Sequence, residues 1–320
     1  MTQLDVYEVH RHHDPVSGVL PDVVNALVGQ NGRLATTMRR TYTGHLMPSR
    51  TEIVQMVDLL REVIFPGYFG SRDVTEASLA YHMGATLDRI AIVMTDEIHR
   101  GLCFACSKDP QSRSHQACFE SAQSITSRFM TSLPEIRRLL ALDAVAAYEG
   151  DPACTSPAEA IFCYPGLQAL TSHRIAHELH RLDVPLIPRI IAEHAHSTTG
   201  IDIHPGARIG EKCFIDHGTG VVVGETCIVG DRVRIYQGVT LGARRFPKDE
   251  DGNPIKGIAR HPVIEDNVTI YSGATILGRV TIGEGSVIGG NVWLTRSVPP
   301  GSQIAQARPI PEVFSAGGGI

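Results

Sequence analysis

The sequence lacks the features that mark several large classes of protein. Its 320 residues carry a net charge of −5 and no long basic run, which argues against a surface that binds nucleic acid. No stretch approaches the roughly 18 consecutive apolar residues of a membrane-spanning helix. The N-terminus, MTQLDVYEVHRHHDP, is polar and charged, so we expect no secretory leader.

Cysteine is also scarce. The chain has seven cysteines, an odd number that does not fit a disulfide framework in a protein of this length. Reduced thiols and a cytoplasmic location are the simpler interpretation. Hydrophobic residues make up 42% of the chain and charged residues 20%, which is typical of a globular protein long enough for two domains.

A six-residue repeat dominates the C-terminal part of the chain. Aliphatic residues occupy every sixth position from Ile203 to Val239 and from Ile264 to Leu294, with one cysteine among them. Glycines often follow, where the backbone must turn. This period fits neither a helix nor a hairpin, and it predicts a left-handed parallel β-helix with three faces to each coil. The charged stretch between Gly242 and His261 has no repeat and is expected to form an extruded loop.

The first 196 residues follow a different period. Apolar residues spaced three and four apart predict helices in three segments, at 46–66, 133–152 and 166–182. Ser49 and Glu52 have the spacing of a capping box, and Pro134 suits a first helical turn.

The two periods together predict an α+β fold. We expect an α-helical domain at residues 1–196, a left-handed β-helix at residues 197–306, and a flexible tail at residues 307–320. The tail ends in three glycines and an isoleucine, a composition typical of mobile segments.

Acidic and imidazole side chains interrupt the repeat twice, at Asp202-Ile203-His204 and at Asp216-His217. Asp202 precedes His217 by fifteen residues, so with about eighteen residues to a coil the two would lie near one another on adjacent coils. A carboxylate that accepts from one ring nitrogen leaves the other as a base, near its ordinary pKa of ~6.5. Taken alone, the pattern fits a solvated histidine equally well.

The motifs around these residues resemble those of the serine O-acetyltransferases, a family of hexapeptide-repeat acyltransferases. The resemblance rests on GDPA at Gly150, IDIHPGARIG, FIDHGTGVVVGE, QGVTLGA and RHPVIEDNVTI, and it spans residues 133–300. It implies transfer of the acetyl group of acetyl-CoA to the hydroxyl of L-serine, the first committed step to cysteine. Serine would attack the thioester directly, with His217 as the general base.

The resemblance also implies roles for the other matching residues. Asp202 would pair with His217, while Asp216 and Asp151 would contact the ammonium or hydroxyl of serine. Arg260 and His261 would receive the serine carboxylate. A zwitterionic substrate needs such a set, because carboxylates attract its ammonium and arginine can bind its carboxylate in bidentate fashion.

Acetyl-CoA is the implied co-substrate, in a groove between neighbouring subunits. The family uses backbone groups of small turn residues there, and the matching residues are Gly242, Ala243, Ser272, Gly273, Ala274 and Gly290. Small corner residues are also what the fold itself requires. The chain departs from the family in its long loop after Gly242, and it lacks Gly-Val-Pro-Ala-Arg after Pro300.

An assembly and a partner are implied as well. β-helices of this kind form trimers, so we expect a homotrimer, or two trimers joined through the helical domains. In the family a C-terminal isoleucine docks into O-acetylserine sulfhydrylase. Ile320 ends this chain, and its carboxylate could imitate that of an amino acid; an unpartnered tail is the alternative. Neither nucleic acid nor a membrane is expected as a partner.

Two groups of possible metal ligands stand apart from these motifs. Cys103 and Cys106 form a CxxC near His115 and Cys118, a Cys₃His combination known from zinc sites, although reduced thiols are the simpler interpretation. Packing or interface roles are expected for three histidines of one helix face, His173, His177 and His180. No metal is therefore expected.

Three other functions fit parts of the sequence. A γ-class carbonic anhydrase would need three histidines around a metal, for which the solenoid offers His204, His217 and His261, and it would leave the helical domain unexplained. An inactive module that regulates the sulfhydrylase through its tail conflicts with the intact catalytic motifs. A sugar acceptor conflicts with Asp151 and Arg260, a pair suited to an amino acid.

Overall fold

The structure, a computed structural model, describes residues 18–28, 47–106 and 114–307. The chain divides into two compact units, Met1–His45 and Leu46–Ile320. The described part of the first unit contains helix α1 (Leu20–Val28). None of the described helices combines the length and the hydropathy that crossing a bilayer requires.

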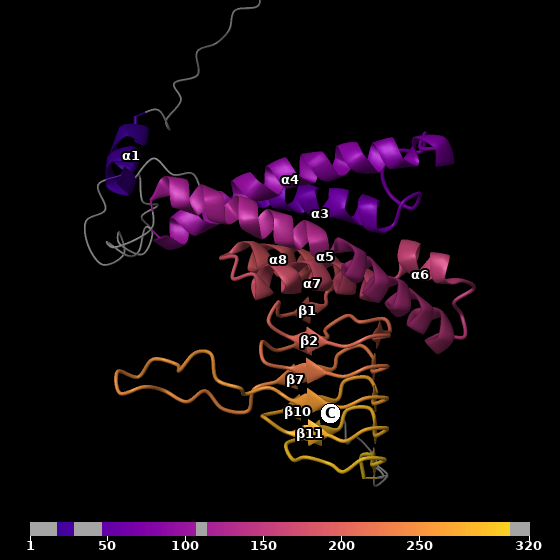
Figure 1. Ribbon diagram of the computed structural model, residues 1–320. Helices are drawn as coiled ribbons and strands as arrows, with labels where there is room; N and C mark the ends of the chain where they lie inside the picture. Colours follow the sequence, from indigo (N-terminus) through magenta and orange to yellow (C-terminus); the bar gives the residue numbers. More distant parts are fainter. Residues whose placement is uncertain (1–17, 29–46, 107–113, 308–320) are drawn as a thin grey trace, which may run out of the picture. The chain divides into compact units, whose positions relative to one another are not determined.

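Helices form the first part of the larger unit, as the sequence predicts (Figure 1). Those in the described residues are α3 (Arg50–Ile64), α4 (Glu76–Cys106), α5 (His115–Gly150), α6 (Pro157–Cys163), α7 (Pro165–Arg181) and α8 (Ile187–Thr199). α4 packs against α3 and α5, and α7 packs against α8 and α5. The last helix ends three residues before the first strand, and the predicted domain boundaries themselves stay predictions.

Two details of the helix ends differ from the sequence interpretation. Ser49 does cap α3, because its hydroxyl accepts from the N–H of Glu52 at 3.3 Å. In a capping box the side chain of Glu52 would accept from the N–H of Ser49. Here that N–H donates instead to Oε2 of Glu97 at 2.5 Å. Pro134 lies inside α5 rather than in a first turn, so that prediction was wrong.

Short parallel strands form the three faces of a prism below the helices (Figure 1). The first face contains β1 (Asp202–Ile203), β4 (Val222–Val223), β7 (Thr240–Gly242), β10 (Thr275–Leu277) and β13 (Trp293–Leu294). The second contains β2 (Arg208–Ile209), β5 (Ile228–Val229), β8 (Val263–Ile264) and β11 (Thr281–Ile282). The third contains β3 (Phe214–Ile215), β6 (Arg234–Ile235), β9 (Thr269–Ile270), β12 (Val287–Ile288) and β14 (Gln303–Ile304). The predicted loop leaves the prism between β7 and β8.

The first coil is longer than the repeat predicts. Ile203 pairs with Val223, twenty residues further on, whereas Val223 pairs with Leu241, eighteen residues further on. The two extra residues lie between Ile215 and Val223, in the segment that contains His217. The six-residue repeat is therefore interrupted by two residues at the corner that carries His217.

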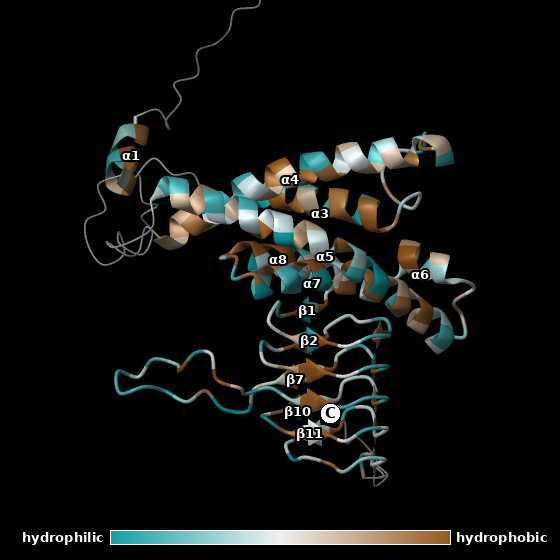
Figure 2. Ribbon diagram, in the orientation of Figure 1, coloured by the Kyte–Doolittle hydropathy of each residue, from teal (hydrophilic) through white to brown (hydrophobic). Residues whose placement is uncertain are grey.

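On each face two residues point into the prism: the aliphatic residue of the strand and the residue two positions before it. For this reason every sixth residue is still buried after the insertion. After the insertion the predicted run falls on the second of these two residues, at Val221, Cys227, Val233 and Val239, all of them buried. Strands β7 and β10 are accordingly coloured as hydrophobic in Figure 2.

A buried ion pair joins the helices to the first coil. Arg174 on α7 donates from Nε and Nη2 to the two carboxylate oxygens of Asp143 on α5, at 2.7 and 2.9 Å. Arg174 also donates to the carbonyl oxygen of Gly210 at 2.8 Å, and Asp143 accepts from the N–H of Cys213 at 3.0 Å. The two side chains are 5% and 0% exposed, so the pair is satisfied within the protein.

Replacing Arg174 with alanine should lower the free energy of unfolding by about 3–5 kcal/mol, because the buried carboxylate of Asp143 loses its partner. Urea denaturation would measure the loss. The matched control is Arg181→Ala on the same helix, whose exposed pair with Glu178 should contribute no more than about 1 kcal/mol. Equal losses in the two variants would contradict the proposed importance of the buried pair.

Candidate active site

Two helix ends approach the strand that leads into His217. Gly150 ends α5 and Gly166 lies in the first turn of α7. A Cβ on Gly150 would lie 2.6 Å from the ring of Phe214, and one on Gly166 would overlap the carbonyl oxygen of Ile215. Because only glycine allows these approaches, both helices reach the strand at backbone distance.

His217 projects from a tight, left-handed turn. Its φ is +56°, and the N–H of Gly218 donates to the carbonyl oxygen of Asp216 at 2.6 Å across it. A non-glycine residue in this conformation is strained by about 1–3 kcal/mol, and such residues concentrate at functional sites. The imidazole is 71% exposed, with Nδ1 3.9 Å from Oδ1 of Asp216. The turn thus presents the ring to a molecule bound outside the corner.

Asp202 begins the first coil, and its N–H donates to the carbonyl oxygen of Val221 at 2.9 Å. Within the described ranges no hydrogen bond joins its carboxylate to His217, and the carboxylate at ion-pair distance is that of Asp216. The predicted spacing assumed an eighteen-residue coil, and the coil here has twenty. The pairing of Asp202 with His217 stays a prediction.

Asp151 lies just beyond α5, with its carboxylate held by two donors that the sequence interpretation missed. The hydroxyl of Tyr164 donates to Oδ2 at 2.5 Å, and the N–H of Ala153 donates to Oδ1 at 2.8 Å. The bond from Tyr164, then that from Ala153, and finally the charge of His217 hold the pKa of Asp151 below its usual value. Asp151 is therefore ionised in neutral solution and lies within electrostatic range of His217.

Arg260 follows the long loop, directly before β8. Its Nη2 donates to Oε2 of Glu225 at 2.7 Å, and its N–H donates to Oγ1 of Thr226 at 3.0 Å. Nε is buried and has no hydrogen-bond partner among the described residues. A buried donor needs a partner, and Nε of this guanidinium remains able to donate to a carboxylate.

His261 is buried beside Arg260 in one tautomer. Its Nδ1 accepts from the N–H of Thr226 at 3.1 Å, and Oγ1 of Thr226 lies 2.9 Å from the same nitrogen. The proton is therefore on Nε2. Burial first, and then the charge of Arg260, lowers the pKa of His261. The ring is neutral at pH 7 and offers a single N–H donor.

These groups stand on two different corners of the prism. His217 lies between β3 and β4, at the corner from the third face to the first. Arg260 and His261 lie between β7 and β8, at the corner from the first face to the second. Each chain therefore carries two half-sites, one with a base and carboxylates and one with a guanidinium and an imidazole donor.

The residues predicted to bind acetyl-CoA divide between the same corners. Ser272, Gly273 and Gly290 lie at the His217 corner, where a Cβ on Gly290 would be 3.2 Å from the carbonyl oxygen of Ser272. Gly242 and Ala243 lie where the loop begins, at the other corner.

Ala274 is the exception among these predictions. Its side chain is fully buried in the prism. Its N–H donates to the carbonyl oxygen of Tyr271, and its own carbonyl oxygen accepts from Thr240. Its side chain therefore belongs to the core, and the contact of Ala274 with acetyl-CoA stays a prediction.

Three further histidines, His204 in the solenoid and His173 and His177 on α7, have structural surroundings. Nδ1 of His204 accepts from the N–H of Gly206 at 3.0 Å, and burial lowers the pKa of His204 to about 4. Among the described residues His204, His217 and His261 form no cluster at metal-ligand distance. His173 is buried on α7, and Nδ1 of His177 donates to the carbonyl oxygen of Pro205 at 2.8 Å.

Two family models match the chain. The one described as serine acetyltransferase, N-terminal, matches residues 83–172, and the one described as bacterial transferase hexapeptide (six repeats) matches residues 261–296. The first match begins well before residue 133, where the sequence resemblance starts.

Relatives with this description align over most of the chain. The "Serine acetyltransferase, plasmid" of Synechococcus elongatus is 54% identical over 275 residues, 86% of each chain. The serine acetyltransferase of Mycobacterium tuberculosis is 47% identical over 177 residues, 53% of this chain and 73% of that one.

Solved structures of the same kind share the architecture. Entamoeba histolytica serine acetyltransferase 1 in complex with L-cysteine superposes with a TM-score of 0.67 at 37% identity, over 78% of this chain and 86% of that one. Neisseria gonorrhoeae serine acetyltransferase in complex with serine gives 0.51 at 28% identity, over 80% and 97%. The predicted fold class, a helical domain followed by a left-handed β-helix, is confirmed.

Replacing Tyr164 with phenylalanine should raise the pKa of Asp151, because the ionised carboxylate loses its strongest hydrogen bond. The wild-type pKa is depressed, so this bond stabilises the fold above the pKa of an unfolded aspartate and is lost as the pH falls through the folded value. NMR titration of the Asp151 carboxyl carbon would follow the shift. Tyr148→Phe, an exposed change on α5, is the control and should leave the titration unchanged.

Proposed function

This chain belongs to the serine acetyltransferase family, and from that premise we propose a mechanism in which His217 is the general base for acetyl transfer from acetyl-CoA to L-serine. The chain is an acyltransferase, and the finer steps are our proposal. The observation that carries it is the exposed imidazole of His217, held by a strained turn within electrostatic range of the ionised Asp151.

The chemistry requires a base because the hydroxyl of serine is a weak nucleophile at neutral pH. His217 removes the hydroxyl proton as the serine oxygen attacks the carbonyl carbon of the thioester. The tetrahedral intermediate then breaks its bond to the CoA sulfur, and the imidazolium returns the proton to that sulfur. The products are O-acetyl-L-serine and CoA, so the reaction supplies the first step of cysteine synthesis.

Serine is bound by the charges that its zwitterion demands. Asp151 and Asp216 hold the ammonium beside the base, with Asp202 orienting the ring in the assembled site. Arg260 donates to the carboxylate from Nε, and His261 donates a hydrogen bond from Nε2. The buried Nε of Arg260 and the neutral tautomer of His261 support these assignments.

The separation of the two half-sites supports a homotrimer. One chain brings His217 and Arg260 to different corners of its prism, so a complete site needs the His217 corner of one copy beside the Arg260 corner of the next. The acetyl-CoA groove then runs between them, with Ser272, Gly273 and Gly290 on one wall and Gly242 and Ala243 on the other.

Several expectations from the resemblance stay predictions. Ile320 lies outside the described residues, so its docking into O-acetylserine sulfhydrylase rests on the resemblance. The joining of two trimers through the helical domains is a prediction of the same kind, and the cytoplasmic location is predicted from the cysteines alone.

Replacing His217 with alanine should lower kcat by ~10²–10⁴-fold with little change in the KM for serine, because the base acts on the transition state. Serine-dependent release of CoA from acetyl-CoA, followed with a thiol reagent, would measure both constants. His196→Ala, an exposed change on α8, is the matched control and should behave as wild type. A His217→Ala enzyme with near-normal kcat would exclude His217 as the base.

Mixing two inactive variants would test the shared site. His217→Ala and Arg260→Ala should each be nearly inactive alone. After dissociation and reassembly in equal amounts, roughly a quarter of the interfaces join an intact His217 to an intact Arg260 by random assortment, so about that fraction of activity should return. Activity that never exceeds the sum of the separate variants would place the whole site in one chain.

A further inference from the structure

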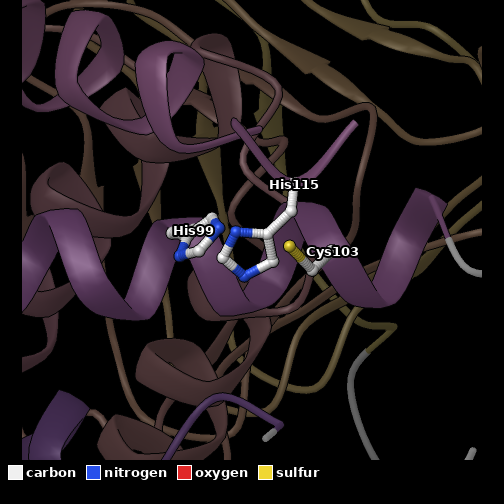
Figure 3. Close-up of side chains that lie close together, drawn as sticks. All are labelled: His99, Cys103 and His115. Atoms are coloured by element: carbon white, nitrogen blue, oxygen red, sulfur yellow. The ribbon is translucent and has the colours of Figure 1, made fainter. Parts of the chain in front are cut away.

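A cluster of metal-binding side chains lies between α4 and α5, separate from both half-sites. His99 and Cys103 are one turn apart on one face of α4, and His115 is the first residue of α5. One imidazole nitrogen from each histidine and the Sγ of Cys103 all lie within 4.8 Å of one another. Figure 3 shows the three side chains turned toward one another from the two helices.

Two aromatic contacts and a further thiol lie beside this cluster. The rings of His99 and His115 meet edge to face, with centroids 4.3 Å apart, and Phe119 packs on His99 at 5.5 Å. Cys118, one turn after His115 on α5, is buried and lies near Cys103. It lies outside the group of three donors, so the cation would draw its side chain in as the fourth ligand.

We propose that His99, Cys103, His115 and Cys118 bind one zinc-like divalent cation as a structural site. Thiolate and imidazole donors favour such a cation over magnesium or calcium, and four of them complete a tetrahedron. Two thiolates and two neutral imidazoles balance its charge. Binding releases two thiol protons, one each from Cys103 and Cys118.

Cys106 is an outer partner of this site. Its Sγ lies 3.7 Å from that of Cys118, well beyond the ~2.05 Å of a disulfide and within reach of a sulfur hydrogen bond. With the cation bound, the thiol of Cys106 donates to the Cys118 thiolate. Such partners tune affinity less than the ligands do, so Cys106 should matter less than Cys118.

The site would fasten α4 to α5 where the chain passes from one to the other. α5 is the helix that carries Asp143 in the buried ion pair and ends beside Asp151. The cation therefore acts on the stability of the helical layer and has no part in acetyl transfer.

Titration of the untagged, metal-free full chain with Co²⁺ under reducing conditions tests the proposal. We expect one equivalent to bind, with the thiolate-to-cobalt absorption and intense d–d bands of a tetrahedral site, and Zn²⁺ to displace it. Two protons should be released for each cation bound. Binding without thiolate-to-cobalt absorption would overturn the site.

Single substitutions identify the ligands. Cys118→Ser and His115→Gln should each weaken Co²⁺ binding by at least about 100-fold, and Cys106→Ser by about 10-fold. Cys163→Ser, at an exposed thiol on α6, is the matched control and should bind as wild type. His115 is exposed, so its variant should fold, which circular dichroism would verify. Unchanged affinity in folded His115→Gln would overturn the proposal.

Discussion

The buried ion pair between Asp143 and Arg174 is the contact on which the geometry of the larger unit depends. It joins two helices and the first coil of the β-helix at once, because each charge also binds backbone groups of that coil. Apolar packing tolerates small slips, whereas a buried charge pair is satisfied only when its hydrogen bonds align. That alignment brings Gly150 and Gly166 against β3, and so sets Asp151 near His217.

The prism divides the chemistry between its corners. Its strands are only two or three residues long, so functional side chains lie where one face turns into the next. The corner with the extra two residues carries His217, and the corner with the long loop carries Arg260 and His261. In the proposed mechanism the stack of coils holds each half-site in place, and a neighbouring copy brings the other half.

Histidines illustrate how the surroundings decide what one residue type does. His217 is exposed on a strained turn, whereas His261 is buried, neutral and limited to donating a hydrogen bond. His204 is half-buried, and this burial lowers its pKa to about 4. His99 and His115 lie beside the thiol of Cys103 between two helices, where we propose that they bind a cation. Their positions along the chain do not distinguish these roles.

The sequence by itself determined the β-helix, the helical layer, the extruded loop and the motif around His217. Six-residue and helical periods depend only on residues that lie close together along the chain. Only the tertiary structure decided the twenty-residue first coil, the core position of Ala274 and the contacts of Tyr164, Glu225 and Thr226. Glu225 meets Arg260 across 35 residues, a separation set by the loop rather than by the repeat. The pairing of His99 with His115 likewise depends on how α4 and α5 pack. Contacts of this kind follow from coil register and helix packing, which no short stretch of sequence encodes.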